Sequence, residues 1–285
     1  MGEPGNENGY SVTLIERRLV AEGTMAFYFA KPPQFAFTPG QFVDLTLPQP
    51  SETDAAGNTR AFSIASAPQE STLMVATRLR DTAFKRELQR MPIGSIVRME
   101  GPFGRLVLHA DQTRPAVFLA GGIGITPFRS MVVQAAMQRS PHPMVLFYSN
   151  RRPEDAPFLD ELQALQDKNP HYRFVGTMTE PEKSSRPWQG EKGYLNAALL
   201  SKYLGNVEKP IYYVVGPPGM VPALRAMLKE ARIEDSDIRT EKFAGYLRKT
   251  PSSRRCLRSS ETQAMMPPPT DTDASEPVPL LIVPV

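Results

Sequence analysis

The chain has 285 residues, 41% of them hydrophobic, which is enough for about two domains with ordinary cores. Its formal net charge is only +3, with 33 basic and 30 acidic residues spread along the chain, so no global charge points to nucleic acid as a partner. The single cysteine, Cys256, excludes an internal disulfide and cannot by itself supply a thiolate zinc site or an iron-sulfur cluster. Redox chemistry in this chain would therefore use an organic cofactor.

The sequence also lacks the signals of membrane insertion and of metal binding. No apolar run reaches the roughly 18 to 20 residues of a membrane helix, and the first ten residues do not resemble a secretion signal. We therefore expect no membrane span and a cytoplasmic location. His109, His142 and His171 show no metal-ligand spacing and have no cysteine nearby, so a metal site is not expected.

The first part of the chain, residues 10 to about 109, consists of short apolar runs separated by turn residues. Strands are predicted at 11–20, 25–30, 41–47, 61–65, 73–79 and 96–99, and this spacing is typical of an antiparallel barrel. One helix interrupts the strands. It is predicted to begin near Thr82, because Phe84, Leu88 and Met91 recur at spacings of three and four.

After Pro115 the pattern changes to strands that alternate with longer helices. Strands are predicted at 116–120, 144–148, 173–177 and 211–215, and helices at 127–139, 158–168 and 221–231. Such alternation indicates a parallel sheet with helical crossovers, doubly wound. We place the domains at 8–112 and 113–246. Residues 247–285 are rich in Ser, Thr and Pro without periodicity and are predicted to be a disordered tail.

The strongest local signal is LAGGIGITPFRSM at 119–131, where a buried strand runs into three glycines and then a helix. Gly121, Gly122 and Gly124 would let a pyrophosphate approach backbone amides at the positive end of that helix, which Thr126 and Pro127 begin. The spacing differs from the common GxGxxG fingerprint. Taken alone, the segment is equally compatible with a plain glycine turn.

A second candidate segment, RAFS at 60–63, lies on a predicted barrel strand. Arg60 and Phe62 would share one face of the strand, with Ser63 on the other face or at the strand end. Arginine pairs with phosphate, an aromatic ring covers a planar heterocycle, and a hydroxyl bonds a ring nitrogen. Four isolated residues are also what an ordinary half-buried strand with an exposed arginine would show.

Six motifs in order make residues 10–246 resemble the ferredoxin-NADP reductase superfamily: PGQF at 39–42, RAFS at 60–63, GPFG at 101–104, GGIGITP at 121–127, VGPPGM at 215–220 and EKFAGY at 241–246. The resemblance implies an α+β two-domain protein. An antiparallel six-stranded flavin-binding β-barrel would be followed by a doubly wound α/β nucleotide-binding domain. FAD is favoured over FMN, and NAD(P)H would be the co-substrate.

The resemblance assigns roles in flavin binding to the barrel. RAFS is similar to the family motif RxYS, so Arg60 would meet the flavin phosphate, Phe62 would lie on the isoalloxazine and Ser63 would approach N5. Thr82 would receive the flavin pyrophosphate, although it could equally be a simple helix cap. Ala61 and Thr77 are included among the cofactor-binding residues.

The resemblance assigns the remaining roles to the second domain. The glycine loop would hold the nicotinamide dinucleotide, and VGPPGM, with Gly216, Pro217 and Met220, would line the nicotinamide pocket, where Val215 replaces the family's frequent cysteine. Ser149, Asn150, Arg151 and Arg152 would hold the adenosine ribose, and the two arginines could favour NADPH or simply be solvated. In EKFAGY, Glu241 would relay a proton and Phe243 would cover the flavin, unless the segment is only a terminal strand.

The sequence thus predicts a flavin-dependent oxidoreductase that moves hydride from NAD(P)H to bound FAD and then electrons to a separate acceptor such as ferredoxin or flavodoxin. The runner-up is the reductase component of an oxygenase, or a free flavin or ferric reductase. Two alternatives belong to other functional classes. One is a flavin- or nucleotide-binding redox sensor without significant turnover, and the other is a scaffold that has lost the flavin.

Overall fold

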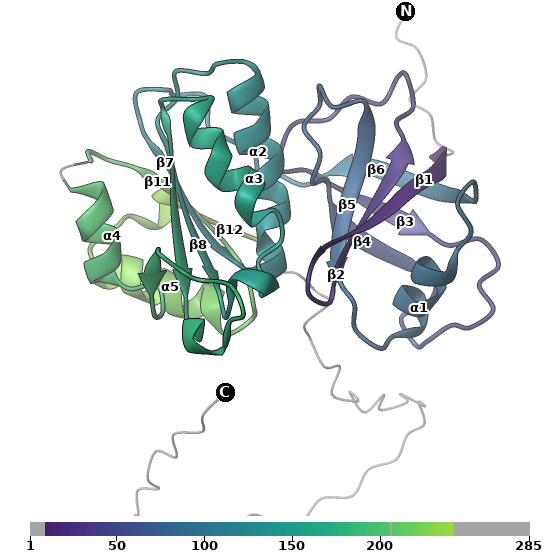
Figure 1. Cartoon of the computed structure of the whole chain (residues 1–285). Coiled ribbons are helices and arrows are strands. Elements are labelled where there is room, and N and C mark those ends of the chain that lie inside the picture. Colours follow the sequence, from purple (N-terminus) through teal and green to yellow (C-terminus); the bar gives the residue numbers. More distant parts are fainter. Residues whose placement is uncertain (1–8, 206, 242–285) are drawn as a thin grey trace, which may run out of the picture. The chain divides into compact units, whose positions relative to one another are not determined.

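Two six-stranded sheets, one antiparallel and one parallel, form the framework of the described chain (Figure 1). The structure is a computed structural model that describes residues 9–205 and 207–241. All of these described residues belong to one compact unit. The predicted tail at 247–285 lies outside the described residues.

The first sheet is the predicted barrel. Its strands are β1 (Tyr10–Ala21), β2 (Thr24–Ala30), β3 (Phe42–Thr46), β4 (Thr59–Ser63), β5 (Thr72–Arg78) and β6 (Ile96–Phe103), with α1 (Ala83–Arg90) between β5 and β6. The strand order is β4-β3-β6-β1-β2-β5, every pairing is antiparallel, and a bridge between Ile64 and Val75 joins the two ends. Closure of this kind removes most of the free sheet edge. Alternate side chains, among them Phe27, Phe29 and Leu45, fill the interior.

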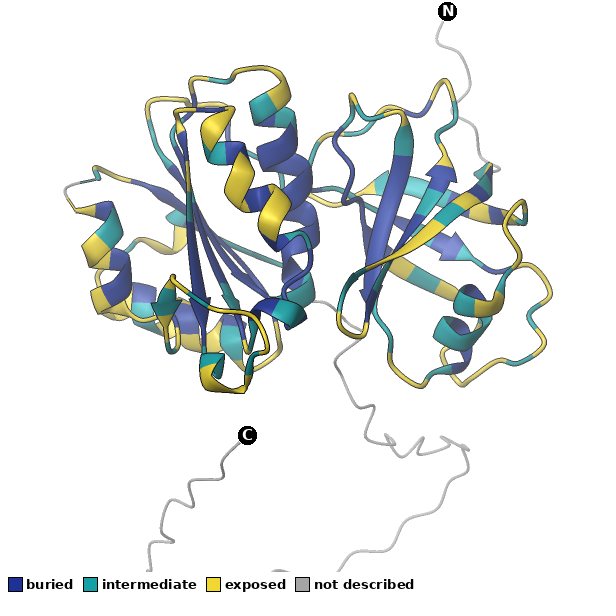
Figure 2. Cartoon of the chain, viewed as in Figure 1, coloured by how far each residue is buried: buried dark blue, intermediate teal, exposed yellow. Residues whose placement is uncertain are grey.

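The second sheet is parallel, as predicted, with order β10-β9-β8-β7-β11-β12. Its strands are β7 (Ala116–Gly121), β8 (Met144–Asn150), β9 (Tyr172–Met178), β10 (Glu191–Lys192), β11 (Ile211–Val215) and β12 (Ile238–Glu241), and its helices are α2 (Thr126–Met137), α3 (Leu159–Ala164), α4 (Ala197–Leu204) and α5 (Met220–Glu230). Strand side chains alternate between two cores. Phe118 packs with α2 and α3 on one face, and Leu119 packs with α4 and α5 on the other. The central strands of this sheet are buried along most of their length (Figure 2).

Three elements of the second half, one helix and two strands, were not among the predicted ones, and one helix is shorter than predicted. The helix expected at 158–168 ends at Ala164 and continues as a 3₁₀ turn from Leu165 to Asp167. The helix α4 was not predicted, although Asn196 caps it by accepting a hydrogen bond from the Leu199 amide at 2.8 Å. The two-residue β10 was not predicted either, and β12 was expected only as the alternative for EKFAGY.

A buried histidine pair joins the segment between the two sheets, which holds His109, to the loop before β8, which holds His142. Nε2 of His109 and Nε2 of His142 lie 2.8 and 3.0 Å from the Arg114 carbonyl, so each must donate a proton to it. Nδ1 of His109 lies 2.8 Å from the Tyr213 hydroxyl, which already accepts from the His109 amide and from Arg239 and therefore donates its own proton to Nδ1. His109 is thus held neutral. Burial lowers the pKa of both imidazoles.

This arrangement predicts a stability loss in acid. Because the folded-state pKa of each histidine lies below its unfolded value of about 6.5, the unfolded chain binds more protons and stability falls as pH drops below that value. Between about pH 7.5 and pH 5.5 we expect the melting temperature of the wild type to fall about 2–4 °C more than that of a His109→Gln/His142→Gln variant. Thermal unfolding of both proteins across this range is the measurement, and parallel slopes would contradict the expectation.

Candidate functional site

The predicted nucleotide residues gather at the carboxyl ends of four neighbouring parallel strands. Gly121 at the end of β7 lies beside Ser149 of β8, and Val215 at the end of β11 lies beside Glu241 of β12. In an open α/β sheet, this edge is where ligands bind. Topology therefore brings GGIGITP, VGPPGM, the Ser149 segment and Glu241 to one edge.

The glycines of GGIGITP are required by close packing against the 215–220 loop. A Cβ at Gly124 would lie 2.5 Å from the Val215 carbonyl oxygen and 2.8 Å from the Gly216 nitrogen, and one at Gly121 would lie 2.3 Å from Sδ of Met220. The two loops are therefore in backbone contact. This contact is a structural reason for Gly121 and Gly124 besides the predicted approach of a pyrophosphate.

The end of the glycine loop is tightly organised before the helix begins. Gly122 to Ile125 form a 3₁₀ turn, and α2 starts at Thr126 with Pro127 in its first turn, as the sequence predicted. Thr126 is 3% exposed, and its hydroxyl donates to the Ile123 carbonyl at 3.2 Å. Its predicted contact with a pyrophosphate stays a prediction, because this hydroxyl already has a partner.

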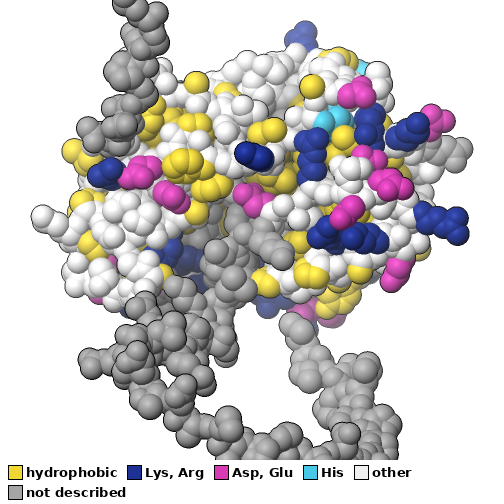
Figure 3. All heavy atoms as spheres, turned by 180° about the vertical axis from the view of Figure 1, so that it is seen from behind, with side chains coloured by type: hydrophobic (Ala, Val, Ile, Leu, Met, Phe, Trp, Pro, Cys, Tyr) yellow, Lys and Arg dark blue, Asp and Glu magenta, His cyan; other side chains and the backbone are white. Residues whose placement is uncertain are grey.

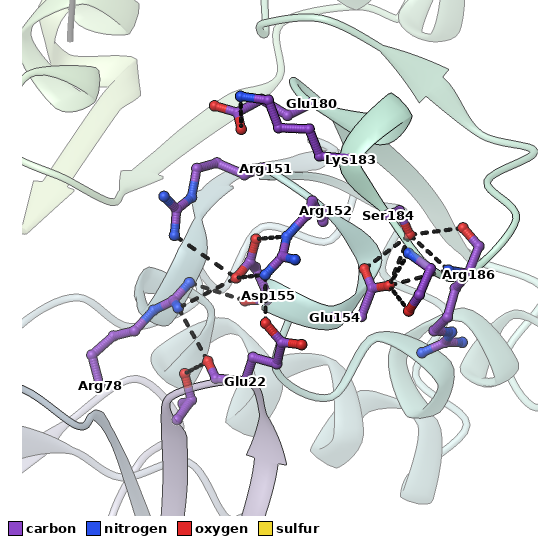
Figure 4. Close-up of polar contacts among 12 residues, drawn as sticks. Glu22, Arg78, Arg151, Arg152, Glu154, Asp155, Glu180, Lys183, Ser184 and Arg186 are labelled. Atoms are coloured by element: carbon purple, nitrogen blue, oxygen red, sulfur yellow. Dashed lines mark hydrogen bonds and ion pairs between the residues drawn. The ribbon is translucent and has the colours of Figure 1, made fainter.

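A barrel arginine that the sequence analysis did not single out lies beside this loop. Gly122 has a φ of +53°, and a Cβ built on it would lie 3.8 Å from Nη2 of Arg78, the last residue of β5. Arg78 donates to the carbonyls of Glu22 and Asp155, as Figure 4 shows. No sequence pattern marks this proximity, because it arises only when β5 and the glycine loop meet in space.

The two arginines predicted to meet the ribose differ in exposure and in how far their charge is already paired with carboxylates (Figure 4). Arg152 is bound by two carboxylates: its Nε lies 3.0 Å from Asp155, and its Nη2 pairs with Glu22 of the β1–β2 turn. The Arg151 side chain is 63% exposed and lies 3.8 Å from Asp155. Burial acts to raise the pKa of Asp155, but the hydrogen bond from Arg152 and the nearby arginines outweigh it and lower the pKa. Arg151 is the guanidinium left accessible.

Glu154, next to Asp155, holds the loop that follows β9. Its carboxylate accepts from the hydroxyls of Ser184 and Ser185 and from the amides of Ser185 and Arg186, at 2.6–3.1 Å. Hydrogen bonds from Ser185 and Ser184 lower the pKa of Glu154 to about 2 although burial opposes them. This carboxylate therefore stays charged, and its position fixes the 184–186 loop relative to β8.

The flavin motif RAFS lies on β4 with the predicted facing, but two of its side chains are already engaged. Arg60 and Phe62 share a face, since both contact the Phe84 ring, at 5.1 and 5.8 Å. Arg60 is bound by Asp54 at 2.7 Å and by carbonyls of its own loop, and Phe62 is 8% exposed within the barrel core. Ala61 is exposed on the other face. Contacts of Arg60 and Phe62 with a flavin stay predictions.

The start of α1 carries the residue expected to receive a pyrophosphate. Thr82 is the N-cap of α1, but its hydroxyl makes no capping hydrogen bond, so the alternative of a simple side-chain cap is not what the structure shows. Lys85, one turn on, donates to the Arg78 carbonyl at 2.7 Å. Burial, together with the charges of Arg80 and Arg60, lowers the pKa of Lys85 to about 8. Several cationic groups thus converge at this helix start.

Thr77 is less suited to ligand binding. It is 7% exposed in the wall of the barrel, and its hydroxyl lies 3.4 Å from the Arg78 carbonyl, a long contact. Its role in cofactor binding stays a prediction.

Buried polar atoms without partners concentrate at the predicted site residues. Seven buried side-chain nitrogen or oxygen atoms in the described chain have no hydrogen-bond partner, and four of them belong to Ser63, Asn150 and Glu241. Buried polar atoms in proteins are normally satisfied, so these atoms call for an explanation, and contact with a ligand stays the prediction. One hydroxyl, one amide and one carboxyl suit a flavin and a nucleotide, which carry both donors and acceptors.

Glu241 is the titratable member of this set. It ends β12 and is half-buried, and burial raises the pKa of its carboxyl to about 7. A carboxyl that titrates near neutrality can hold and release a proton under ordinary conditions. Phe243, predicted to act with it, lies outside the described residues, as does the rest of EKFAGY.

Comparison with known proteins gives the family. The Oxidoreductase NAD-binding domain model matches residues 118–226. The electron transfer component of toluate 1,2-dioxygenase from Pseudomonas putida is 30% identical over 242 residues, covering 83% of this chain and 68% of that protein. This chain belongs to the ferredoxin-NADP reductase family of FAD- and NAD(P)-binding oxidoreductases.

Two further family members match a similar share of this chain. Ferredoxin-NADP reductase B of Sorangium cellulosum is 28% identical, covering 77% of this chain and 90% of that protein. The fold matches a ferredoxin NADP+ reductase from Neisseria gonorrhoeae, solved with bound FAD and NADP, with a TM-score of 0.65 at 22% identity over 83% of this chain and 99% of that one. The chain covers only 49% and 58% of the length of two other relatives.

Family membership makes the chain an NAD(P)H-dependent flavoprotein oxidoreductase, as the sequence predicted. The two-domain fold class is likewise confirmed. No helix within 9–205 and 207–241 is long and apolar enough to cross a membrane. The same residues contain no group of three or more His, Cys, Asp or Glu side chains placed to hold a metal ion. On the face drawn in Figure 3, basic and acidic side chains are interspersed, without separating into regions of one sign.

Proposed function

We propose that this ferredoxin-NADP reductase family member binds FAD on its barrel and NAD(P)H at the carboxyl edge of its parallel sheet, and passes electrons to a separate redox protein. The observation that carries the proposal is the set of unpartnered buried atoms on Ser63, Asn150 and Glu241. When bound, the flavin supplies the acceptor for a hydride and the ability to release electrons singly. The domain limits 8–112 and 113–246 are part of the proposal.

The chain's own residues would bind and orient the two ring systems. Ser63 offers a buried hydroxyl at the end of β4, and Thr82 offers a hydroxyl not used for capping at the start of α1, next to the cationic Lys85. The glycine loop and the 215–220 loop, in backbone contact, would line the nicotinamide subsite. Glu241 would hold a proton at its buried Oε2. Alignment of this kind is the protein's main contribution to hydride transfer.

The proposed acceptor is a separate redox protein, either a ferredoxin, a flavodoxin or an oxygenase component. The relative from Pseudomonas putida is an electron transfer component of a dioxygenase, and the relative from Sorangium cellulosum is a ferredoxin-NADP reductase, so both classes have support. With one cysteine, the 285 residues hold no iron-sulfur cluster of their own, so such an acceptor would lie outside them. A cytoplasmic location is also part of the proposal, and cell fractionation tests it.

The experiment that tests the function is an absorption spectrum of the purified protein during anaerobic titration with NADPH or NADH, followed by an assay with ferricyanide. We expect a flavin spectrum that bleaches on titration and sustained reduction of ferricyanide. A flavin-loaded protein without turnover would identify a redox sensor instead. A colourless protein that takes up no flavin on incubation would identify a scaffold.

The preference for NADPH over NADH is predicted to depend on Arg151. Because its guanidinium is accessible, Arg151→Ala should raise the KM for NADPH about tenfold, the worth of one charge-assisted pair, and leave the KM for NADH nearly unchanged. Arg152→Ala is the matched control: since its charge is committed to Asp155 and Glu22, it should change both KM values alike. Steady-state kinetics with both nucleotides decide, and equal effects of Arg151→Ala on the two would end the assignment.

A further inference from the structure

A buried arginine on the helix after the glycine loop makes hydrogen bonds to two separate segments, the barrel segment 65–70 and the helix α3. Arg129 of α2 is 5% exposed. Its guanidinium donates to the Ala65 carbonyl at 2.7 Å, to both carboxylate oxygens of Glu70 at 3.0 and 3.1 Å, and to both of Glu161 at 2.8 and 2.5 Å. Five donors meet five acceptor contacts, so the group is fully satisfied.

The next residue makes a parallel contact with the same barrel segment. Ser130 is fully buried and donates its hydroxyl to the Ser66 carbonyl at 2.7 Å. Two consecutive residues of α2 thus bind two consecutive carbonyls that follow β4. The barrel segment is itself held in place, since Glu70 accepts from the Ala67 amide at 2.6 Å and Lys31 donates to the Glu70 carbonyl at 3.1 Å.

These contacts are close in sequence to both halves of the site. Arg129 lies three residues after Thr126, where the glycine loop becomes helix, and Ala65 lies two residues after Ser63. The path from the end of the glycine loop to the flavin motif therefore runs through one turn of helix, one guanidinium and two residues of chain. A shift of Arg129 relative to the barrel segment 65–70 would displace the glycine loop relative to the end of β4.

We infer that Arg129 and Ser130, through Glu70 and the carbonyls of Ala65 and Ser66, are positioning residues that set the glycine loop in register with the end of β4. The inference rests on the proposed function, because the register matters for rate only if hydride passes between groups held by these two segments. A misplacement of about 1 Å can cost roughly 100-fold in rate. None of these residues needs to touch either cofactor.

The two carboxylates on Arg129 provide a matched pair of variants. Glu70 belongs to the barrel, whereas Glu161 belongs to α3, in the same sheet layer as α2. Glu70→Gln weakens the 3.0 Å ion pair between the barrel and α2, and Glu161→Gln weakens a shorter pair, at 2.5 Å, within the nucleotide-binding half. Both remove one negative charge beside the same guanidinium. A purely structural role of Arg129 predicts similar consequences for the two variants.

The test is stopped-flow reduction of the flavin-loaded protein at saturating NAD(P)H. We expect Glu70→Gln to slow flavin reduction about tenfold, a fraction of the penalty for a full misalignment, and Glu161→Gln to stay within about twofold of wild type. The KM for the nucleotide should change little in either variant, since the nucleotide loop itself is intact. Ser130→Ala, which keeps every charge, should slow reduction in the same direction as Glu70→Gln.

A second readout does not need the flavin. Hydrogen-deuterium exchange of the flavin-free proteins should show faster exchange at residues 64–70 in Glu70→Gln and Ser130→Ala, but not in Glu161→Gln. Equal slowing by Glu70→Gln and Glu161→Gln, or unchanged rates with faster exchange at 64–70, would overturn the inference. If Glu70→Gln fails to fold, Ser130→Ala alone decides. A wild-type protein that does not oxidise NAD(P)H would instead refute the proposed function. The exchange result would then still test whether Glu70 and Ser130 hold residues 64–70 in place.

Discussion

Gly124→Ala is expected to lower kcat/KM for NAD(P)H by about 100-fold, the effect of displacing reacting groups by about an ångström. A Cβ at this position would lie 2.5 Å from the Val215 carbonyl oxygen and 2.8 Å from the Gly216 nitrogen. Real Cβ atoms do not approach that closely, and both partners are backbone atoms, which cannot rotate away. The glycine loop or the 215–220 loop must move. Steady-state oxidation of NAD(P)H with ferricyanide measures the consequence.

Gly219→Ala is the control for this variant. Gly219 lies in the neighbouring loop just before α5, its φ is −77°, and an added Cβ meets nothing within 4 Å. The two substitutions add the same methyl group to two loops that contact each other, so a general effect of an added methyl group is excluded if only Gly124→Ala impairs turnover. Flavin content should stay at the wild-type level in both, since neither glycine belongs to the barrel. Wild-type turnover by Gly124→Ala would mean that the loop contact is unimportant for the nucleotide subsite.

The elements of the fold could be predicted largely from periodicity because each buries one regular face. Phe84 and Leu88 recur at helical spacing and are buried in α1, and the all-apolar run of β7 becomes a strand buried on both faces. The helix α4 escaped because its signal is a cap, Asn196, followed by only eight residues. The strand β10 has two residues, too few for any pattern.

The site was predictable only where its residues lie within motifs. Ser63 and Glu241 stand in motifs, Asn150 stands in the segment assigned to the adenosine ribose, and all three have unpartnered buried atoms in the structure. Arg78 and Glu70 were missed, because their importance comes from neighbours far away along the chain. Nor does a motif reveal that a side chain is already engaged. Arg60 and Arg152 look free in the sequence, yet each is paired with a carboxylate, Asp54 or Asp155.

The Glu241→Gln variant is expected to be more stable than the wild type at high pH and equally stable in mild acid. Burial raises the folded-state pKa of this carboxyl from 4.5 to about 7. Between these two values the folded protein retains a proton that the unfolded chain has released. The folded state therefore binds more protons, and the wild type loses stability as pH rises through this range. Glutamine stays neutral at every pH and does not contribute such a loss.

The shift implies a contribution on the order of 3 kcal/mol once the pH is well above 7. Urea unfolding of both proteins, flavin-free, at about pH 5 and about pH 8 measures it, and only the difference between the proteins is used because other groups titrate too. We expect equal stability in acid and an advantage for Glu241→Gln in base. A constant difference between the two across the range would show that the carboxyl is charged in the folded state throughout.

The same titration should appear in turnover if Glu241 holds a proton during the reaction. In the flavin-loaded wild type, the rate should change with an inflection near pH 7, the folded-state pKa of this carboxyl. Glu241→Gln should remove the inflection and lower the rate by about 100-fold, within the range general acid-base groups contribute. Stability and rate would then move in opposite directions on one substitution. That combination is typical of a buried ionisable group retained for function at the expense of stability, and a residue with only a structural role would not produce it.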